Sequence, residues 1–123
     1  MRVTEIAMSD KIDTIRSSSS GTIGRAQSVV RGQTLRLDSS ARPQPDALTN
    51  SEAFLAGVSS CGVTLIEGYA KEKGVPMRRM DVTIEGVRTA AEPNRFATVS
   101  MTFELAGVTQ QQAESLVEVY SQR

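Results

Sequence analysis

The feature that most constrains the fold is a stretch without a single charge, residues 53–66, with the sequence AFLAGVSSCGVTLI. Thr49 and Glu52 precede it at the spacing of a capping box, the side-chain arrangement that begins many helices. Within the stretch, apolar residues recur at intervals of three and four, which is the period of one helix face. We therefore predict a long helix from Thr49 to about residue 73, buried on nearly every side between residues 53 and 66.

The segments before this helix predict a hairpin. Residues 23–30 and 34–38 read as two strands that flank a tight turn at residues 31–33. Residues 1–20 show only scattered apolar side chains and end in four serines, so we expect a weakly organised segment there. At 123 residues the chain fits one domain, which we place over residues 21–123.

The segments after the helix predict two more strands and a second helix. Residues 80–87 and 99–105 alternate apolar and polar side chains, the period of a half-buried strand. Residues 109–112 have capping-box spacing and begin a helix that runs toward the end of the chain. This order of elements predicts an α+β fold in which antiparallel strands wrap around the long central helix.

Composition excludes several classes of function. The chain has no histidine and one cysteine, which argues against Ser-His-Asp catalysis, Cys-His catalysis and the usual zinc sites, so we expect no metal and no cofactor. Fourteen Lys and Arg balance fourteen Asp and Glu, so we expect no nucleic-acid partner. No apolar run approaches the ~20 residues of a membrane span, and the charged N-terminal residues are unlike a signal peptide. We expect a soluble, cytoplasmic protein.

Cys61 is the one residue that could be a nucleophile of high intrinsic reactivity. A lone cysteine is either a small packing residue or a reactive thiol. It lies about three turns into the predicted helix, beyond the first turn where the helix dipole acts most strongly. A reactive Cys61 therefore needs a cation from another element. The nearby aromatic residues are expected to be core and to carry no chemistry: Phe54, Tyr69 and Phe103.

Residues 51–87, SEAFLAGVSSCGVTLIEGYAKEKGVPMRRMDVTIEGV, resemble the core of the osmotically induced protein C (OsmC) and organic hydroperoxide resistance family. Members of that family are similar in placing a glutamate near the start of the long helix, then a run of small residues, then a cysteine. Here Glu52 and Cys61 stand nine residues apart. The flanking strands and second helix come in the family's order, so the resemblance covers residues 22–123.

The resemblance implies thiol-dependent reduction of organic hydroperoxides, in which the Cys61 thiolate attacks the peroxide and becomes a sulfenic acid. It also implies an arginine on the N-terminal hairpin that supports the thiolate; Arg25 and Arg31 both qualify. Glu52 would orient that arginine, although a capping role alone explains a glutamate at this position. The implied partners are a second copy of the chain in an intertwined homodimer, a small hydroperoxide and an external thiol reductant.

One departure from the family bears on turnover. Peroxidases of the family resemble one another in a second, resolving cysteine after the last helix, whereas this sequence has one cysteine and ends at Arg123, where that segment would start. A sulfenic acid without a partner thiol waits for an external one. Either the chain is truncated before the second cysteine, or it is a natural variant that lost the resolving step, and in the second case we expect impaired turnover. The alternative is a non-catalytic dimer of the same fold that binds a small apolar ligand, with Cys61 as core packing.

Overall fold

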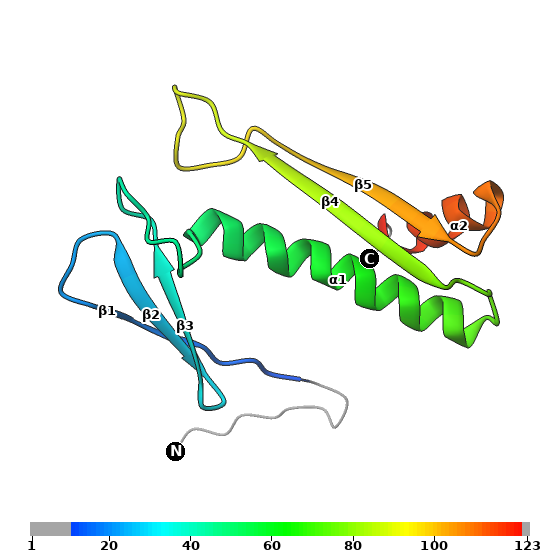
Figure 1. Ribbon diagram of the computed structural model, residues 1–123, viewed down its shortest axis with the longest axis horizontal. Coiled ribbons are helices and arrows are strands. Elements are labelled where there is room, and N and C mark those ends of the chain that lie inside the picture. Colours follow the sequence, from blue (N-terminus) through cyan, green and yellow to red (C-terminus); the bar gives the residue numbers. More distant parts are fainter. Residues whose placement is uncertain (1–10, 122–123) are drawn as a thin grey trace, which may run out of the picture. The chain divides into compact units, whose positions relative to one another are not determined.

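The computed structural model describes residues 11–121, which form two compact units divided after Asn50 (Figure 1). We call them the N-terminal unit and the C-terminal unit and describe each by itself. The prediction of a single domain over residues 21–123 stays a prediction. Half of the expected weakly organised segment, residues 1–10, lies outside the described residues.

The N-terminal unit is a three-stranded antiparallel sheet. Its strands are β1 (Arg16–Ser19), β2 (Arg25–Val30) and β3 (Gln33–Asp38), in the spatial order β1-β2-β3. The predicted hairpin is confirmed by β2 and β3. The expectation of weak organisation differs from the structure in β1, where serines pair with the edge of β2 and Ser17 Oγ lies 2.8 Å from Ser28 Oγ.

The turn between β2 and β3 holds a non-glycine residue in an unusual conformation. Val30 and Gln33 form the last strand pair, so Arg31 and Gly32 alone make the turn. Their φ angles are 50° and 76°, as a type I′ hairpin turn requires at both central positions. Glycine adopts positive φ readily, whereas a long side chain such as that of Arg31 does so at a cost.

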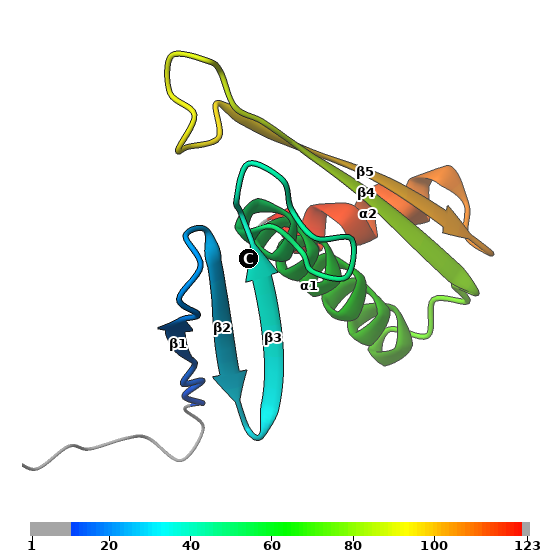
Figure 2. The same ribbon diagram turned by 60° about the vertical axis from the view of Figure 1, so that its left-hand side comes forward.

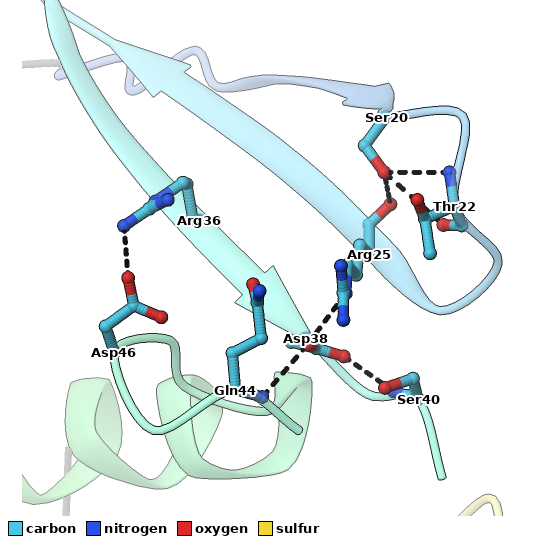
Figure 3. Close-up of polar contacts among 8 residues, drawn as sticks. All are labelled: Ser20, Thr22, Arg25, Arg36, Asp38, Ser40, Gln44 and Asp46. Atoms are coloured by element: carbon cyan, nitrogen blue, oxygen red, sulfur yellow. Dashed lines mark hydrogen bonds and ion pairs between the residues drawn. The ribbon is translucent and has the colours of Figure 1, made fainter. Parts of the chain in front are cut away.

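Asp38 is the one buried residue in the described part of the N-terminal unit, with 1% of its surface exposed. Its Oδ1 accepts the Ser40 N–H, and its Oδ2 accepts the Gln44 N–H and the Arg25 Nε–H, each at 3.0 Å (Figure 3). Hydrogen bonding from Ser40 is the largest cause that lowers the pKa of Asp38 to about 2, against the opposing effect of burial; Gln44 and Arg25 lower it further. A polar cluster therefore occupies the place of a hydrophobic core.

The loop that follows β3 is tied to the hairpin by backbone groups as well. Asp38 N–H donates to Leu48 O at 2.8 Å, and Ser39 N–H donates to Gly24 O at 2.8 Å. Asn50 N–H donates to Ser39 Oγ at 2.9 Å. These bonds hold the loop to the hairpin as far as Asn50, the first residue of the long helix.

The C-terminal unit contains the long helix, a hairpin and a short helix. These are α1 (Asn50–Glu72), β4 (Arg79–Val87), β5 (Thr98–Ala106) and α2 (Gln110–Ser121). The strands β4 and β5 pair antiparallel along their whole length, as predicted (Figure 2). The second capping box is present in both directions, because Gln112 N–H donates to Thr109 Oγ1 at 3.1 Å and Thr109 N–H to Gln112 Oε1 at 3.0 Å.

The core of this unit lies where α1, β4 and α2 meet. Its buried hydrophobic members are Ile66, Ala70, Met80 and Leu116. Toward the other end, Gly62 is buried where a Cβ would lie in van der Waals contact with Met101 and Tyr120. The Tyr120 hydroxyl donates to the Val58 carbonyl at 3.2 Å, which fastens the end of α2 to α1.

The prediction that residues 53–66 are buried on nearly every side is wrong for the chain as described. The buried residues of α1 are Gly62, Ile66 and Ala70, all on one face, while Phe54 is 57% exposed. A two-stranded hairpin and one short helix cover a single face of a 23-residue helix, and the apolar side chains outside that face are half-buried or exposed.

The helix α1 is also long and apolar enough to cross a membrane, judged by length and composition alone. The core helix of a soluble protein meets the same criteria, so one such helix is weak evidence for a membrane span. The expectation that no apolar segment approaches the required length therefore needs this qualification.

Replacing Arg31 by asparagine should stabilise the N-terminal hairpin, because Asn tolerates positive φ and Asn-Gly favours type I′ turns. We expect the free energy of unfolding to rise by about 0.5–1 kcal/mol, measured by urea denaturation followed by far-ultraviolet circular dichroism. The matched control, Gly32→Ala, should be destabilised, since it places a side chain at φ 76°. An Arg31→Asn protein no more stable than wild type would contradict this account of the turn.

The low pKa of Asp38 should make the N-terminal unit sensitive to acid. A carboxyl whose pKa is about 2 when folded and about 3.8 when unfolded stabilises the fold above pH ~4 and loses that contribution as the pH falls toward 2. Urea midpoints measured between pH 2 and pH 6 should therefore fall more steeply for wild type than for Asp38→Asn. Equal falls in urea midpoint with pH for wild type and Asp38→Asn would contradict this role of Asp38. Asp46→Asn, at an exposed ion pair, is the control expected to follow wild type.

Candidate functional site

Cys61 is an exposed, free thiol in the middle of α1. It lies in an open groove of about 710 Å³ within the C-terminal unit. Among the residues that the structure describes, the groove is lined mainly by apolar side chains and by no charged one: Ala53, Phe54, Gly57, Val58, Cys61, Leu65, Tyr120 and Ser121. Cys61 is therefore accessible to a small molecule and is not part of the core of its own unit.

Helix geometry explains why the thiol and its apolar neighbours share this groove. Phe54, Val58, Cys61 and Leu65 follow one another at intervals of four, three and four residues, so they lie on one face of α1. The face next to it carries Gly62 and the other buried residues and contacts the rest of the unit. The absence of charge over residues 53–66, read from the sequence as a sign of burial, instead makes the groove apolar.

An aromatic pair lies at the start of this groove. Phe96, from the loop between β4 and β5, stacks on Phe54 with ring centroids 6.0 Å apart and an interplanar angle of 21°. Gly86 lies under the Phe96 ring, where a Cβ would collide with it, and Arg88 lies over the ring at 5.9 Å from its centroid. Phe54 was expected to be core, and the structure places it at the wall of the groove instead.

Glu52 and Cys61 share the same helix but are not brought together. Glu52 lies in the first turn of α1 and is exposed. Nine helical residues span about 13–14 Å along the axis and about half a turn in phase, so the two side chains leave the helix on different sides. Any link between them requires a long side chain from elsewhere, and the predicted role of Glu52 stays a prediction.

The two candidate arginines lie at opposite ends of the same hairpin. Arg25 is the first residue of β2; its Nε lies 3.0 Å from Asp38 Oδ2, and its side chain is 37% exposed. Arg31 lies at the exposed tip of the turn, six residues and therefore about 20 Å farther along the strand. The lining of the Cys61 groove includes neither of them, since it comes entirely from the C-terminal unit.

Among residues 11–121, no group of three or more His, Cys, Asp or Glu side chains is placed to hold a metal ion. The chemistry that the described site offers is that of an accessible thiol with apolar surroundings. Sequence reasoning identified Cys61 but missed Phe96 and Tyr120 as neighbours of the site. A glycine inside a strand, Gly86, was the one signal of a close approach from another segment.

Comparison with known proteins places this geometry in a family. Residues 43–123 match the family model of OsmC-like proteins. No curated protein is significantly similar to the chain in sequence. An OsmC-like protein from Mycoplasma pneumoniae superposes with a TM-score of 0.78 at 16% identity, covering 93% of this chain and 83% of that one.

Two further solved structures are organic hydroperoxide resistance proteins. The one from Elizabethkingia anophelis gives a TM-score of 0.71 at 19% identity, covering 91% of this chain and 84% of that one. The one from Legionella pneumophila gives 0.63 at 20% identity, with 91% and 83% covered. At such identities these likenesses show the fold, whereas the family model matches well over half of the sequence. The resemblance and the α+β fold class predicted from the sequence are thereby confirmed, and the chain belongs to the family of OsmC-like proteins.

Proposed function

We propose that this protein reduces organic hydroperoxides through Cys61 and contributes in this way to defence against oxidative stress. The observation that carries the proposal is the exposed thiol in an apolar groove on the central helix of an OsmC-like fold. The apolar lining suits the organic part of a hydroperoxide, because burying it there removes apolar surface from water. The hydroperoxide-resistance role of two structural relatives points the same way.

The proposed reaction begins with the Cys61 thiolate. It donates an electron pair to one peroxide oxygen, the O–O bond breaks, and the departing alkoxide takes up a proton to become an alcohol. Cys61 is thereby oxidised by two electrons to a sulfenic acid. Because the sequence has no second cysteine, an external thiol condenses with the sulfenic acid and releases water, and another thiol then reduces the mixed disulfide.

Arg25 is the cation that we assign to the thiolate. Its Nε is held by the buried Asp38 carboxylate, so its guanidinium has a defined orientation, whereas Arg31 occupies a turn tip. The loop bonded to Asp38 leads directly into the first turn of α1, which carries Glu52. We assign to Glu52 the role of orienting the same guanidinium.

A homodimer is part of this proposal. The resemblance to the family implies a dimer, and α1 leaves an apolar face uncovered by its own unit, with Phe54 57% exposed. A second copy that covers this face would exclude water from the thiol and strengthen its electrostatic partners. A cytoplasmic location agrees with a single reduced cysteine.

One observation favours the alternative, a non-catalytic dimer that binds a small apolar ligand. Among residues 51–121, no charged side chain lines the groove around Cys61, so this part of the C-terminal unit offers the thiolate no counter-charge there. Replacing Cys61 by serine separates the two functions. If the protein reduces hydroperoxides, the substitution abolishes peroxide consumption. If it only binds an apolar ligand, the substitution changes stability and leaves ligand binding intact.

Treating the protein with a slight excess of cumene hydroperoxide and a 1,3-dione trap should label Cys61 as its sulfenic acid within seconds to minutes, as seen by intact-mass spectrometry. The physical reason is that a supported thiolate in an apolar groove reacts faster than a free thiol. The Cys61→Ser protein should remain unlabelled. Labelling of Cys61 no faster than labelling of a peptide spanning residues 57–65 would contradict the proposed function.

A further inference from the structure

The N-terminal unit contains two ion pairs of very different character. Arg36 Nη2 and Asp46 Oδ2 lie 2.7 Å apart, but both side chains are more than half exposed, at 57% and 59%. The pair of Arg25 and Asp38 joins a partly exposed guanidinium to a carboxylate that is 1% exposed. An exposed pair contributes little to stability, whereas a buried carboxylate is costly unless it is fully hydrogen-bonded. The buried carboxylate of the Arg25–Asp38 pair therefore needs an explanation, whereas the exposed Arg36–Asp46 pair does not.

Asp38 is clamped by the backbone before it contacts the arginine. The Ser40 N–H binds Oδ1 and the Gln44 N–H binds Oδ2, each at 3.0 Å, so both carboxylate oxygens are held by the loop (Figure 3). Backbone donors cannot change rotamer as side-chain donors do. The carboxylate therefore presents Oδ2 to Arg25 from a position set by the fold.

Asp38 holds the planar guanidinium of Arg25 through its Nε atom. Asp38 accepts from Arg25 Nε at 3.0 Å, and the ion pair uses this nitrogen, so the terminal nitrogens extend beyond the contact. This bond restrains the orientation of the guanidinium, because Nε–H lies in the plane of its rigid fork of donors. With a side chain 37% exposed, Arg25 can present the remaining donors to a second anion.

The charges around the pair support a permanent contact. The pKa of Asp38 is about 2, so the carboxylate stays ionised at any pH at which the protein would work. The two backbone donors share its negative charge, which limits how far it neutralises Arg25. The other charged group that lines the adjoining cavity of about 180 Å³ is Arg36, which is paired with Asp46.

We propose that Asp38 is a positioning residue, which acts on the Cys61 thiolate by holding the guanidinium of Arg25. This inference rests on the proposed function, in which Arg25 is the cation beside the thiolate. Asp38 itself touches neither the thiol nor the peroxide. Its role explains why the N-terminal unit keeps a carboxylate at its one buried described position, where an apolar side chain would not have to be desolvated as a charge.

The test measures alkylation of Cys61 by iodoacetamide between pH 5 and pH 10, a selective readout because the chain has a single cysteine. The variants are Arg25→Met, Asp38→Asn and the two combined, with Asp46→Asn as the matched control from the exposed pair. Both single variants should react roughly tenfold more slowly at pH 7 and reach half-maximal rate at a higher pH, because the thiolate has lost its counter-charge. The combined variant should be no slower than Arg25→Met, and Asp46→Asn should match wild type.

The outcomes distinguish the two levels of the account. If Arg25→Met reacts like wild type, the assignment of Arg25 in the proposed function is wrong and the role of Asp38 is wrong with it. If Arg25→Met is slow but Asp38→Asn is not, the positioning role alone is overturned. It is equally overturned if Asp38→Asn slows the reaction further in the Arg25→Met background, since Asp38 would then act through the fold in general. Should Asp38→Asn not fold, Asp38→Glu takes its place: it keeps the charge but moves the carboxylate by one methylene, so it should slow alkylation of the wild-type protein and not of Arg25→Met, and a wild-type rate would overturn the positioning role.

Discussion

The helix α1 carries more apolar surface than the elements of its own unit cover, and this constraint determines most of what the C-terminal unit can do. One face packs on the hairpin and on α2 around Ile66 and Ala70. The neighbouring face keeps Phe54, Cys61 and Leu65 along an open groove. Because residues 53–66 contain no charge, α1 places no charged side chain within one helical turn of the thiol. The same lack of coverage that exposes Cys61 also creates the need for a further covering surface.

The N-terminal unit is built on the opposite principle. Its described part buries one residue, Asp38, and that residue is a carboxylate held by two backbone N–H groups and one arginine. Polar contacts of this kind are directional, so they define orientation more sharply than an apolar core of the same size. The N-terminal unit therefore carries a cation of defined orientation, Arg25, and the C-terminal unit carries an exposed thiol, Cys61.

Local patterns in the sequence predicted the elements well. Alternation predicted β4 and β5, the turn residues predicted the β2–β3 hairpin, and the capping box at Thr109 is present in atomic detail. The strand β1 was missed because its sequence, Arg-Ser-Ser-Ser, has no apolar alternation to reveal it. The burial of α1 was overestimated. A helix segment without charges can be buried on all sides, but the area that is buried depends on how many other elements pack against it.

The site was predictable only in part, because some of its residues stand out in the sequence and others are defined by contacts between distant segments. Cys61 stands out in any reading of the sequence, since it is the single cysteine. Asp38 does not, because its role depends on contacts with Arg25 and Gln44 that join a strand, a hairpin partner and a loop. Phe96 belongs to a loop without periodicity, and its stacking on Phe54 is a tertiary contact. Long-range contacts of these kinds are what a local pattern cannot encode.

The central claim is that Cys61 is a peroxide-reactive thiol and not a packing residue. The most direct measurement is the second-order rate constant for oxidation of the reduced protein, with cumene hydroperoxide and with hydrogen peroxide, against free cysteine under the same conditions. The account predicts that Cys61 reacts faster than free cysteine with both peroxides and faster with the organic one, because of the apolar groove. Rates equal to or below those of free cysteine with both peroxides would contradict it.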